Sequence, residues 1–518
     1  MPAAINLVGI SSGFPNPGTY VEIDFAQGPV SGYGGVRSAL LLGNGASGSS
    51  ATRDTVVYGP DTPVTCQTEA DVISLFGTGS QLHRMFLRFV AVNKVTPLYM
   101  VAVTESAGSA ASLTETLTTA AISNGNHRTW CVDQFVDAPI TSGQNVGQIA
   151  AAVVSAVNSQ SRWPVTASNA SGVITYTAVE AGPEGNWIRM QAQITPATAT
   201  IGTTTSLTAN TYLTGGTTAD NVTNALATII GGRYYYIAVG DSDSTNVGRV
   251  VTQVNSQAQP TTGIRQRVFA GSVDTLANAI TVATGLNAAR AEVTWGSSTD
   301  LTPAELAANN AALYSALEPG TVGVARKNYS LFPSNPTDQN SWLIPAGRNG
   351  IASAPTVAQI TSALNNGITP ITVLGNGTSQ LVKRCTTRSL NGANPDYRIR
   401  DAHKVSICDF WADDAQSITQ TQFGGKDLLQ DPKQGAPAVP NTAVTPSIWA
   451  GALKGLVTRY GNAGQWSSPI PGVYGADYIN GNAIVQAETS PPTRLSALFG
   501  LTPVNIADQF CLLVQQVG

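Results

Sequence analysis

The sequence predicts a multi-domain protein of the α/β and α+β classes. We expect a central, mostly parallel α/β domain, a small inserted α+β module, and a C-terminal α+β domain with strand-like terminal arms. Strands and helices alternate from Asn221 onward, short alternating strands fill residues 139–214, and an apolar strand pattern stands near each end of the chain. At 518 residues the chain exceeds what one core usually holds, so about three domains are expected.

The first predicted element is a strand within an N-terminal arm of residues 1–30. Its side chains alternate between two faces, with Tyr20, Glu22 and Asp24 on one and Val21, Ile23 and Phe25 on the other. This alternation is typical of a half-buried strand. A lone strand is not stable in water, and no preceding helix is available to cover this one. We therefore expect it to pair with a sheet edge elsewhere.

The central domain is expected over residues 31–138 and 215–345. Its first part predicts strands over 37–43 and 97–103, with helices over 68–77 and 81–93 between them. Its second part alternates strands with helices, in the order 233–240, 245–257, 266–271, 273–283, 291–295 and 303–317. Alternation at this spacing predicts right-handed βαβ units and a parallel sheet that is covered on both faces.

The inserted module is expected over residues 139–214, and the C-terminal domain over 346–505. Within the module, the sequence predicts a helix over 148–158 and strands over 165–168, 173–178 and 188–194. The C-terminal domain predicts helices over 356–365 and 447–460 and strands over 371–374 and 381–386. A C-terminal arm, residues 506–518, carries the apolar residues Phe510, Leu512, Leu513 and Val514. Apolar strands at both ends are suited to exchange between copies, because main-chain hydrogen bonds give affinity and side-chain pockets give register.

Composition argues for packing against partners and against nucleic acid or membrane. Charged residues make up 11% of the chain, compared with about 25% in an ordinary soluble domain. A net charge of -4 lacks the basic footprint of a nucleic-acid binder. No signal peptide or membrane-spanning segment is predicted. The five cysteines have no C-x-x-C spacing, so we expect them to be small buried apolar residues.

Two motifs resemble those of enzymes but lack the required context. The run from Gly43 to Gly48 fits G-x-G-x-x-G, yet the residues after it show no helical periodicity to hold a pyrophosphate. The run Asp241-Ser242-Asp243-Ser244-Thr245 matches D-x-D-x-T phosphohydrolases, but no lysine lies between Lys94 and Lys327. We expect Ser244 or Asp243 to cap the following helix instead. The histidines, His83, His127 and His403, lack the context of a hydrolase triad.

Several ordered blocks resemble contractile-tail sheath proteins of the phage Mu type. The blocks cover nearly the whole chain and comprise Pro17 to Asp24, Ala39 to Gly43, Glu69 to Val72, Leu75 to Ser80 with Met85, Pro164 to Ala167, Gly182 to Asn186, Pro492 to Leu495, and Thr502 to Asn505. Residues 320–350 and 425–480 match only loosely. The order of the blocks along the chain, which matches the order in the family, is a much more specific signal than any one motif.

The resemblance implies a structural subunit without a catalytic site, cofactor or metal. It implies hexameric rings that stack as a helix around a tail tube and contract when the baseplate triggers them, with tail terminator proteins as further partners. It also implies a central domain with a subtilisin-like fold, and a location in the virion tail after assembly in the host cytoplasm. The remaining alternatives are another self-assembling virion component, such as a tube or capsid protein, and a D-x-D-x-T phosphohydrolase.

Three further residues are candidates for contacts between chains. In the helix predicted over 447–460, Lys454 and Arg459 lie outside the apolar stripe, so this face is a candidate to meet an acidic tube surface. Cys511 lies in the C-terminal arm, which makes it a candidate for a disulfide between subunits after release into an oxidising medium.

Overall fold

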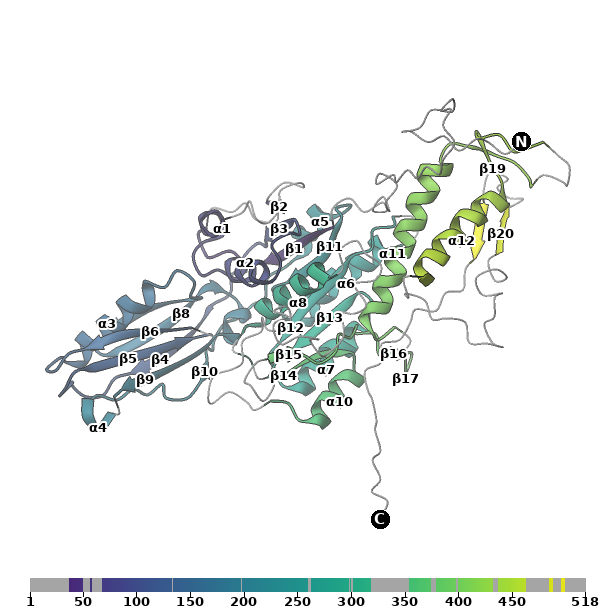
Figure 1. Cartoon of the computed structure of the whole chain (residues 1–518). Coiled ribbons are helices and arrows are strands. Elements are labelled where there is room, and N and C mark those ends of the chain that lie inside the picture. Colours follow the sequence, from purple (N-terminus) through teal and green to yellow (C-terminus); the bar gives the residue numbers. More distant parts are fainter. Residues whose placement is uncertain are drawn as a thin grey trace, which may run out of the picture.

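The computed structural model places an eight-stranded sheet at the centre of an elongated molecule (Figure 1). The inserted module lies at one end of the sheet, in blue, and the helices α11 and α12 lie at the other, in green and yellow-green. The structure describes residues 37–49, 56–57, 68–132, 134–196, 198–259, 262–297, 299, 301–317, 354–373, 379–396, 399–431, 437–462, 484–487 and 495–498.

The central sheet has the strand order β15-β14-β13-β12-β11-β1-β3-β2. All neighbouring pairs from β14 to β3 are parallel, and the edge strands β2 and β15 are antiparallel. The parallel part confirms the interpretation of the strand and helix alternation. The strands are β1 Ser38–Gly43, β2 Val56–Val57, β3 Leu98–Ala102, β11 Tyr234–Val239, β12 Arg267–Ser272, β13 Ala291–Trp295, β14 Ile368–Val373 and β15 Ser379–Leu381.

Helices cover both faces of this sheet, because successive side chains of a strand point to opposite faces. Leu41 of β1 packs in a core with α1, α2 and α8, whereas Leu40 and Leu42 pack in a second core with α5, α6, α7 and α10. These helices are α1 Glu69–Phe76, α2 Gln81–Val92, α5 Thr223–Ile229, α6 Ser244–Gln257, α7 Leu276–Leu286, α8 Pro303–Leu317 and α10 Val357–Asn365.

The helix starts follow cap chemistry in the sequence. Thr68 and Thr356 each form a capping box at the first residues of α1 and α10. The hydroxyl of Ser80 accepts from the amide of His83 at the start of α2. A side-chain oxygen at this position satisfies amides that have no partner within the helix.

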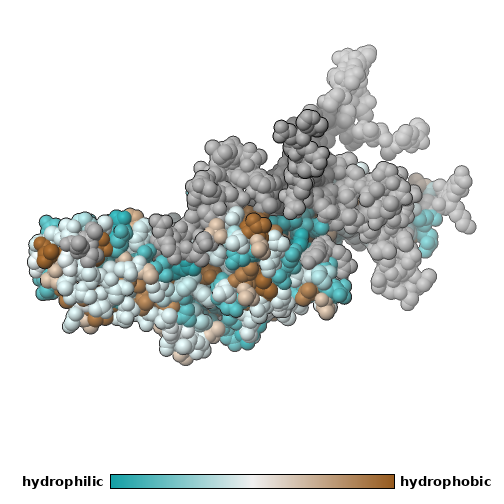
Figure 2. All heavy atoms as spheres, turned by 90° about the horizontal axis from the view of Figure 1, so that it is seen from below, coloured by the Kyte–Doolittle hydropathy of each residue, from teal (hydrophilic) through white to brown (hydrophobic). Residues whose placement is uncertain are grey.

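The inserted module contains two antiparallel sheets and one long helix. Its elements are β4 Ala110–Thr116, β5 Gly125–Cys131, β6 Gln134–Ile140, α3 Val146–Asn158, β7 Val165–Ala170, β8 Val173–Ala181, η3 Pro183–Trp187, β9 Arg189–Thr195, α4 Thr198–Ile201 and β10 Thr211–Tyr212. The sheets have the orders β4-β8-β7 and β10-β9-β5-β6. Figure 2 shows the module with a mostly pale surface and small brown patches, as a sequence poor in charge predicts.

The start predicted for the module, residue 139, is wrong. Residues up to 138, which we assigned to the central domain, include β4, β5 and most of β6, and these three strands belong to the two module sheets. Polar residues on the outer face of these strands, such as Arg128 and Asp137, leave only a short apolar pattern from which to predict a strand. The pairing of β4 with β8 and of β5 with β9 joins residues far apart in sequence, which local periodicity does not reveal.

The C-terminal domain predicted over 346–505 starts too early, because α10, β14 and β15 belong to the central sheet and its helical cover. The region after them is built on two long helices, α11 Ala402–Ile418 and α12 Pro446–Asn462. Between and after them lie short elements: the π-helical turn η5 Thr419–Phe423 and the strands β18 Asp427–Leu428, β19 Ala443–Val444, β20 Ile484–Ala487 and β21 Leu495–Leu498. The short hairpin of β16 Leu390–Asn391 and β17 Asn394–Pro395 precedes α11. None of the described helices is both long and apolar enough to cross a membrane.

Candidate functional site: an arginine row against helix α11

Four arginines stand at the amino ends of central strands. Arg37 precedes β1, Arg265 and Arg267 stand at the start of β12, and Arg290 precedes β13. Parallel strands begin at the same edge of a sheet, so these side chains gather along one edge. We call these four residues the arginine row. Each member of the row contacts α11.

Two aspartates one turn apart on α11 accept hydrogen bonds from three of these arginines. Asp413 accepts from Arg37 at 3.0 Å and from Arg265 at 2.7 Å. Asp409 accepts two bonds from Arg290, at 2.7 and 2.6 Å. Forked arginine–carboxylate bonds of this kind fix orientation as well as adding energy. Burial raises the pKa of Asp413, and the two guanidinium groups partly offset that rise.

Arg37 also stacks between two aromatic rings. Its guanidinium carbon lies 3.6 Å from the centre of the Phe410 ring on α11 and 4.7 Å from that of Tyr235 on β11. A guanidinium over an aromatic face is attracted by the ring quadrupole. Arg37 therefore joins strand and helix by packing as well as by charge.

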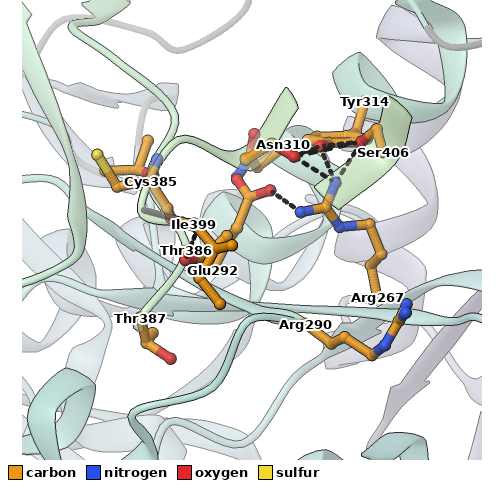
Figure 3. Close-up of polar contacts among 12 residues, drawn as sticks. Arg267, Arg290, Glu292, Asn310, Tyr314, Cys385, Thr386, Thr387, Ile399 and Ser406 are labelled. Atoms are coloured by element: carbon orange, nitrogen blue, oxygen red, sulfur yellow. Dashed lines mark hydrogen bonds and ion pairs between the residues drawn. The ribbon is translucent and has the colours of Figure 1, made fainter. Parts of the chain in front are cut away.

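Arg267 is the most deeply buried of the four, at 3% exposed. One nitrogen donates to the Ala402 carbonyl at 3.1 Å and to the hydroxyls of Ser406 and Tyr314, and the other lies 3.7 Å from Glu292 (Figure 3). These partners lie on α11, α8 and β13. A buried charge must be paired and hydrogen-bonded to be tolerated, so this set of contacts fixes three elements around one side chain.

The opposite side of α11 packs on α12. Ile407 and its neighbours form a small core with Leu456, Val457 and Tyr460. Asp414 accepts from Arg459 at 2.7 Å and from the Tyr460 hydroxyl at 2.8 Å. Helix α11 is thus held by ion pairs to the sheet on one side and by an apolar seam to α12 on the other. This arrangement is suited to carrying a displacement of the C-terminal helices into the central domain without bond chemistry.

Of the residues predicted to contact other chains, Lys454 and Arg459 lie on α12. Lys454 is half-buried, and Arg459 is exposed but pairs with Asp414. The predicted apolar stripe is present, since Leu453, Leu456 and Val457 are buried. The terminal candidates lie outside the described residues; they are Tyr20, Val21, Glu22, Ile23, Phe25, Phe510, Cys511, Leu512, Leu513 and Val514.

The enzyme-like motifs take up structural roles in the described chain. Asp243 caps α6 by accepting from the amides of Thr245 and Asn246 at 2.9 and 3.0 Å, as predicted. The three histidines lie on α2, β5 and α11, which occupy different parts of the molecule (Figure 1). In the described ranges no cluster of three or more His, Cys, Asp or Glu side chains is placed to hold a metal ion.

The cysteine interpretation needs one correction. Cys131 and Cys385 are buried as expected, but Cys408 is exposed. It lies on α11, whose position was not predicted, so its face could not be assigned from the sequence. The other two cysteines fall outside the described residues.

Similarity to solved structures extends over nearly the whole chain, although no family model matches it and no curated protein does. The sheath tail protein of Desulfitobacterium hafniense is 12% identical at a TM-score of 0.48, over 95% of this chain and 97% of its own. That of Listeria innocua is 13% identical at 0.45, over 93% and 95%. The contracted helical sheath of the anti-feeding prophage is 11% identical at 0.44, over 98% and 100%. All three are sheath proteins.

Sequence reasoning missed α11 and the arginine row, although signals for both exist. Each arginine directly precedes or begins an apolar strand, which places it at the amino edge of a parallel sheet. The spacing of Asp409 and Asp413 puts both carboxylates on one helix face. The helix itself was hidden because buried polar residues interrupt its apolar stripe.

Proposed function

We propose that this chain is a structural subunit of a contractile tail sheath. It polymerises as stacked hexameric rings around a tail tube, and rearrangement of its domains and subunits drives the tube through the host envelope. The observation that carries the proposal is the ordered set of sequence blocks resembling sheath proteins, which reaches from the N-terminal arm to residue 505. Its proposed partners are further copies of itself, the tail tube protein, and the baseplate and tail terminator proteins.

Two of these blocks contact each other where the module contacts the central domain. Gly79, in the turn before α2, has a φ of +70°, and a Cβ there would lie 1.9 Å from the carbonyl oxygen of Trp163. Trp163 directly precedes the block that begins at Pro164. A side chain at position 79 is excluded both by the backbone conformation and by this contact. The motif glycine therefore supports the docking of the module, which gives the resemblance a physical basis at this point.

The proposed mechanism divides the chain into parts that stay rigid and parts that connect copies. Residues 1–30 and 506–518 act as arms that pair with the sheets of neighbouring subunits, and the C-terminal region built on α11 and α12 forms the assembly domain. Helix α11, clamped by the arginine row, keeps that domain fixed to the central sheet. Contraction then occurs by movement between rigid subunits, while strand pairing through the arms keeps the lattice connected.

Negative-stain microscopy of the expressed full chain tests this proposal. The expected result is hollow cylinders with the width and striation of a sheath. Thin tubes or closed shells would instead assign the chain to another virion component. Dispersed particles that hydrolyse a phosphate ester would favour an enzyme, and either result would overturn the proposal.

A further inference from the structure

Six carboxyl groups gather where the module meets the central domain. On the central side they lie beyond the carboxyl ends of β3 and β11 and ahead of α5, where the order of strands around β1 reverses. On the module side they come from β8 and η3. The group, which we call the carboxyl junction, consists of Glu105, Glu180, Glu184, Asp220, Asp241 and Asp243.

The two module glutamates reach across the interface to main-chain amides. Glu180 accepts from the amide of Gln81 at the start of α2. Glu184 accepts from both the amide and the hydroxyl of Ser242, at 2.8 and 2.9 Å. Glu180 is 4% exposed and Glu184 is 9% exposed. Both contacts exist only while the module is docked on the central domain.

Two of the central carboxyl groups, Asp220 and Asp241, are also buried. Asp220, 5% exposed, accepts from the amide of Ser106 and from the side chain of Asn44, and Asp241, 3% exposed, accepts from Asn246 at 3.1 Å. The side-chain oxygen of Asn44 has no hydrogen-bond partner, although the residue is 2% exposed. Buried polar atoms normally have partners. A proton on a neighbouring carboxyl group would give this oxygen a donor.

Positive charge at the junction is sparse. In the described part of the chain, one ion pair reaches the junction, from Arg84 to Glu180 at 3.8 Å. Arg84 also faces Glu305 at 3.5 Å, and Glu305 faces Arg88 at 3.6 Å. Arg84 is therefore shared with a carboxylate outside the junction. Like charges packed this closely disfavour full ionisation.

Burial is the main cause that raises the pKa of both module glutamates to about 7. Arg84 and the Gln81 amide oppose the rise at Glu180, and the bonds from Ser242 oppose it at Glu184. Burial likewise raises the pKa of Asp241 well above its ordinary value, with Glu184 and Asp220 adding to the rise. The pKa of Asp220 is raised by burial and by Glu105.

We propose that the carboxyl junction is a proton-dependent latch, which holds the module on the central domain while its buried carboxyl groups carry protons and releases it as they ionise. The inference is independent of the sheath function. It rests on the placement of six carboxyl groups at one interface with one shared arginine.

The sign follows from the direction of the shifts. A carboxyl group whose pKa is higher when docked binds more protons in the docked state, so docking is favoured at low pH and weakened as pH rises through the docked value. A glutamate whose pKa is about 7 when the module is docked and 4.5 when it is released lowers the docking equilibrium constant about tenfold between about pH 6 and about pH 8.5. The two glutamates together give about 100-fold.

Hydrogen exchange on the full chain tests the latch, because three amides donate directly to its carboxyl groups: Gln81, Ser106 and Ser242. After correction for intrinsic base catalysis, the protection of these amides should fall by about 100-fold from about pH 6 to about pH 8.5. Amides inside each part serve as references, such as Ala39, bonded to Pro97, and Ala192, bonded to Leu207. Unchanged protection of the three junction amides would overturn the latch.

A double variant, Glu180→Gln with Glu184→Gln, tests the same point independently. Glutamine keeps the shape and cannot ionise, so the share of the pH dependence that comes from the two glutamates should disappear, and the module should stay docked more firmly than in the parent at about pH 8.5. Asp220 and Asp241 remain as sources of a smaller pH dependence. Glu69→Gln is the matched control: Glu69 pairs with Arg162 across the same interface, but its bond to Arg162 lowers its pKa. The control should keep the full pH dependence. A pH dependence as large in the double variant as in the parent would also overturn the proposal.

Discussion

Arg267 shows how one side chain can hold three elements together. Its guanidinium contacts α8, α11 and β13 from the start of β12, and the residue is 3% exposed. Taking a charge out of water is expensive, and the cost is recovered only if every partner stays in place. A defect at this residue should therefore affect the whole C-terminal half of the central sheet.

Replacing Arg267 by methionine is predicted to destabilise the protein by about 3–5 kcal/mol, because it removes one partner of the buried ion pair with Glu292. The double variant Arg267→Met with Glu292→Met should recover more than half of this loss. Urea unfolding of the full chain measures both. A single variant as stable as the parent would show that the pair contributes nothing to stability.

Glu115 is a second buried charge, in the core of the module, with an exposed fraction of 0%. It accepts from His127 at 2.6 Å, from the Tyr176 hydroxyl at 2.5 Å and from Thr205. Burial by itself would raise the pKa of Glu115, but the bonds from these three residues outweigh it, and the pKa is lowered. The carboxylate therefore stabilises the module in its ionised form.

The module should consequently lose stability in acid. A carboxyl group with a lowered folded pKa contributes stability above its unfolded value of about 4.5, and that contribution is lost as pH falls through the folded value. Glu115→Gln should cost about 1–3 kcal/mol at neutral pH and flatten the acid dependence. Circular dichroism during urea titrations at several pH values tests this. Asp137→Asn, at an exposed ion pair with Arg128, is the control and should change little.

At the scale of elements, α11 is the connection between the central sheet and the C-terminal helices. Its ion pairs with Arg290, Arg265 and Arg37 lie along one side, and its apolar contacts with α12 lie along the other. The helix can transmit force only if both sides remain attached. The bidentate bond between Arg290 and Asp409 is the part of this clamp that depends most on geometry.

Reversing one partner, Arg290→Asp, is predicted to loosen α11 by about 3 kcal/mol, since two carboxylates would then face each other. The swapped pair, Arg290→Asp with Asp409→Arg, should recover part of that loss. Exchange rates of the α11 amides report the change, with the α3 amides of the module as reference. If the swapped pair is as loose as the single variant, direct pairing is not what holds the helix.

Most helices and strands of the central sheet could be predicted because their apolar periods and caps are local. The helices predicted over 68–77 and 356–365, for example, match α1 and α10 within a residue. The strands β4, β5 and β6 were assigned to the wrong unit because partners distant in sequence determine where a strand pairs. Helix α11 was missed because aspartates buried against arginines look like a solvated face in the sequence.

At the scale of the whole molecule, α12 is the candidate tube-facing helix of the proposed sheath. Reversing the charges of Lys454 and Arg459 is predicted to weaken loading onto the tube while sparing tube-free polymers. Because Arg459 also pairs with Asp414, circular dichroism of the double variant checks that α12 stays folded. Lys426→Glu, in the loop before β18, is the matched control. Co-sedimentation with tube protein measures loading, and unchanged loading of the double variant would remove α12 from the tube contact.

The N-terminal strand pattern gives the prediction that bears most directly on assembly. In the proposed sheath, residues Tyr20 to Phe25 add to the sheet of a neighbouring subunit, because main-chain hydrogen bonds can form only where a sheet edge is available. Within the described residues, the central cores form from side chains at position 39 and beyond. Deleting residues 1–25 should therefore leave a folded chain that stays soluble and cannot polymerise.

Point substitutions test whether assembly depends on the strand itself or only on the length of the arm. Val21→Asp with Ile23→Asp places charges on the face that would enter the neighbour's sheet, and should block polymers as completely as the deletion. Glu22→Ser, on the opposite face, should leave assembly unchanged. Microscopy and sedimentation of the three variants at equal concentration give the answer. If the deleted chain still builds cylinders, the subunits are held together by other surfaces and the arm is not the link between them.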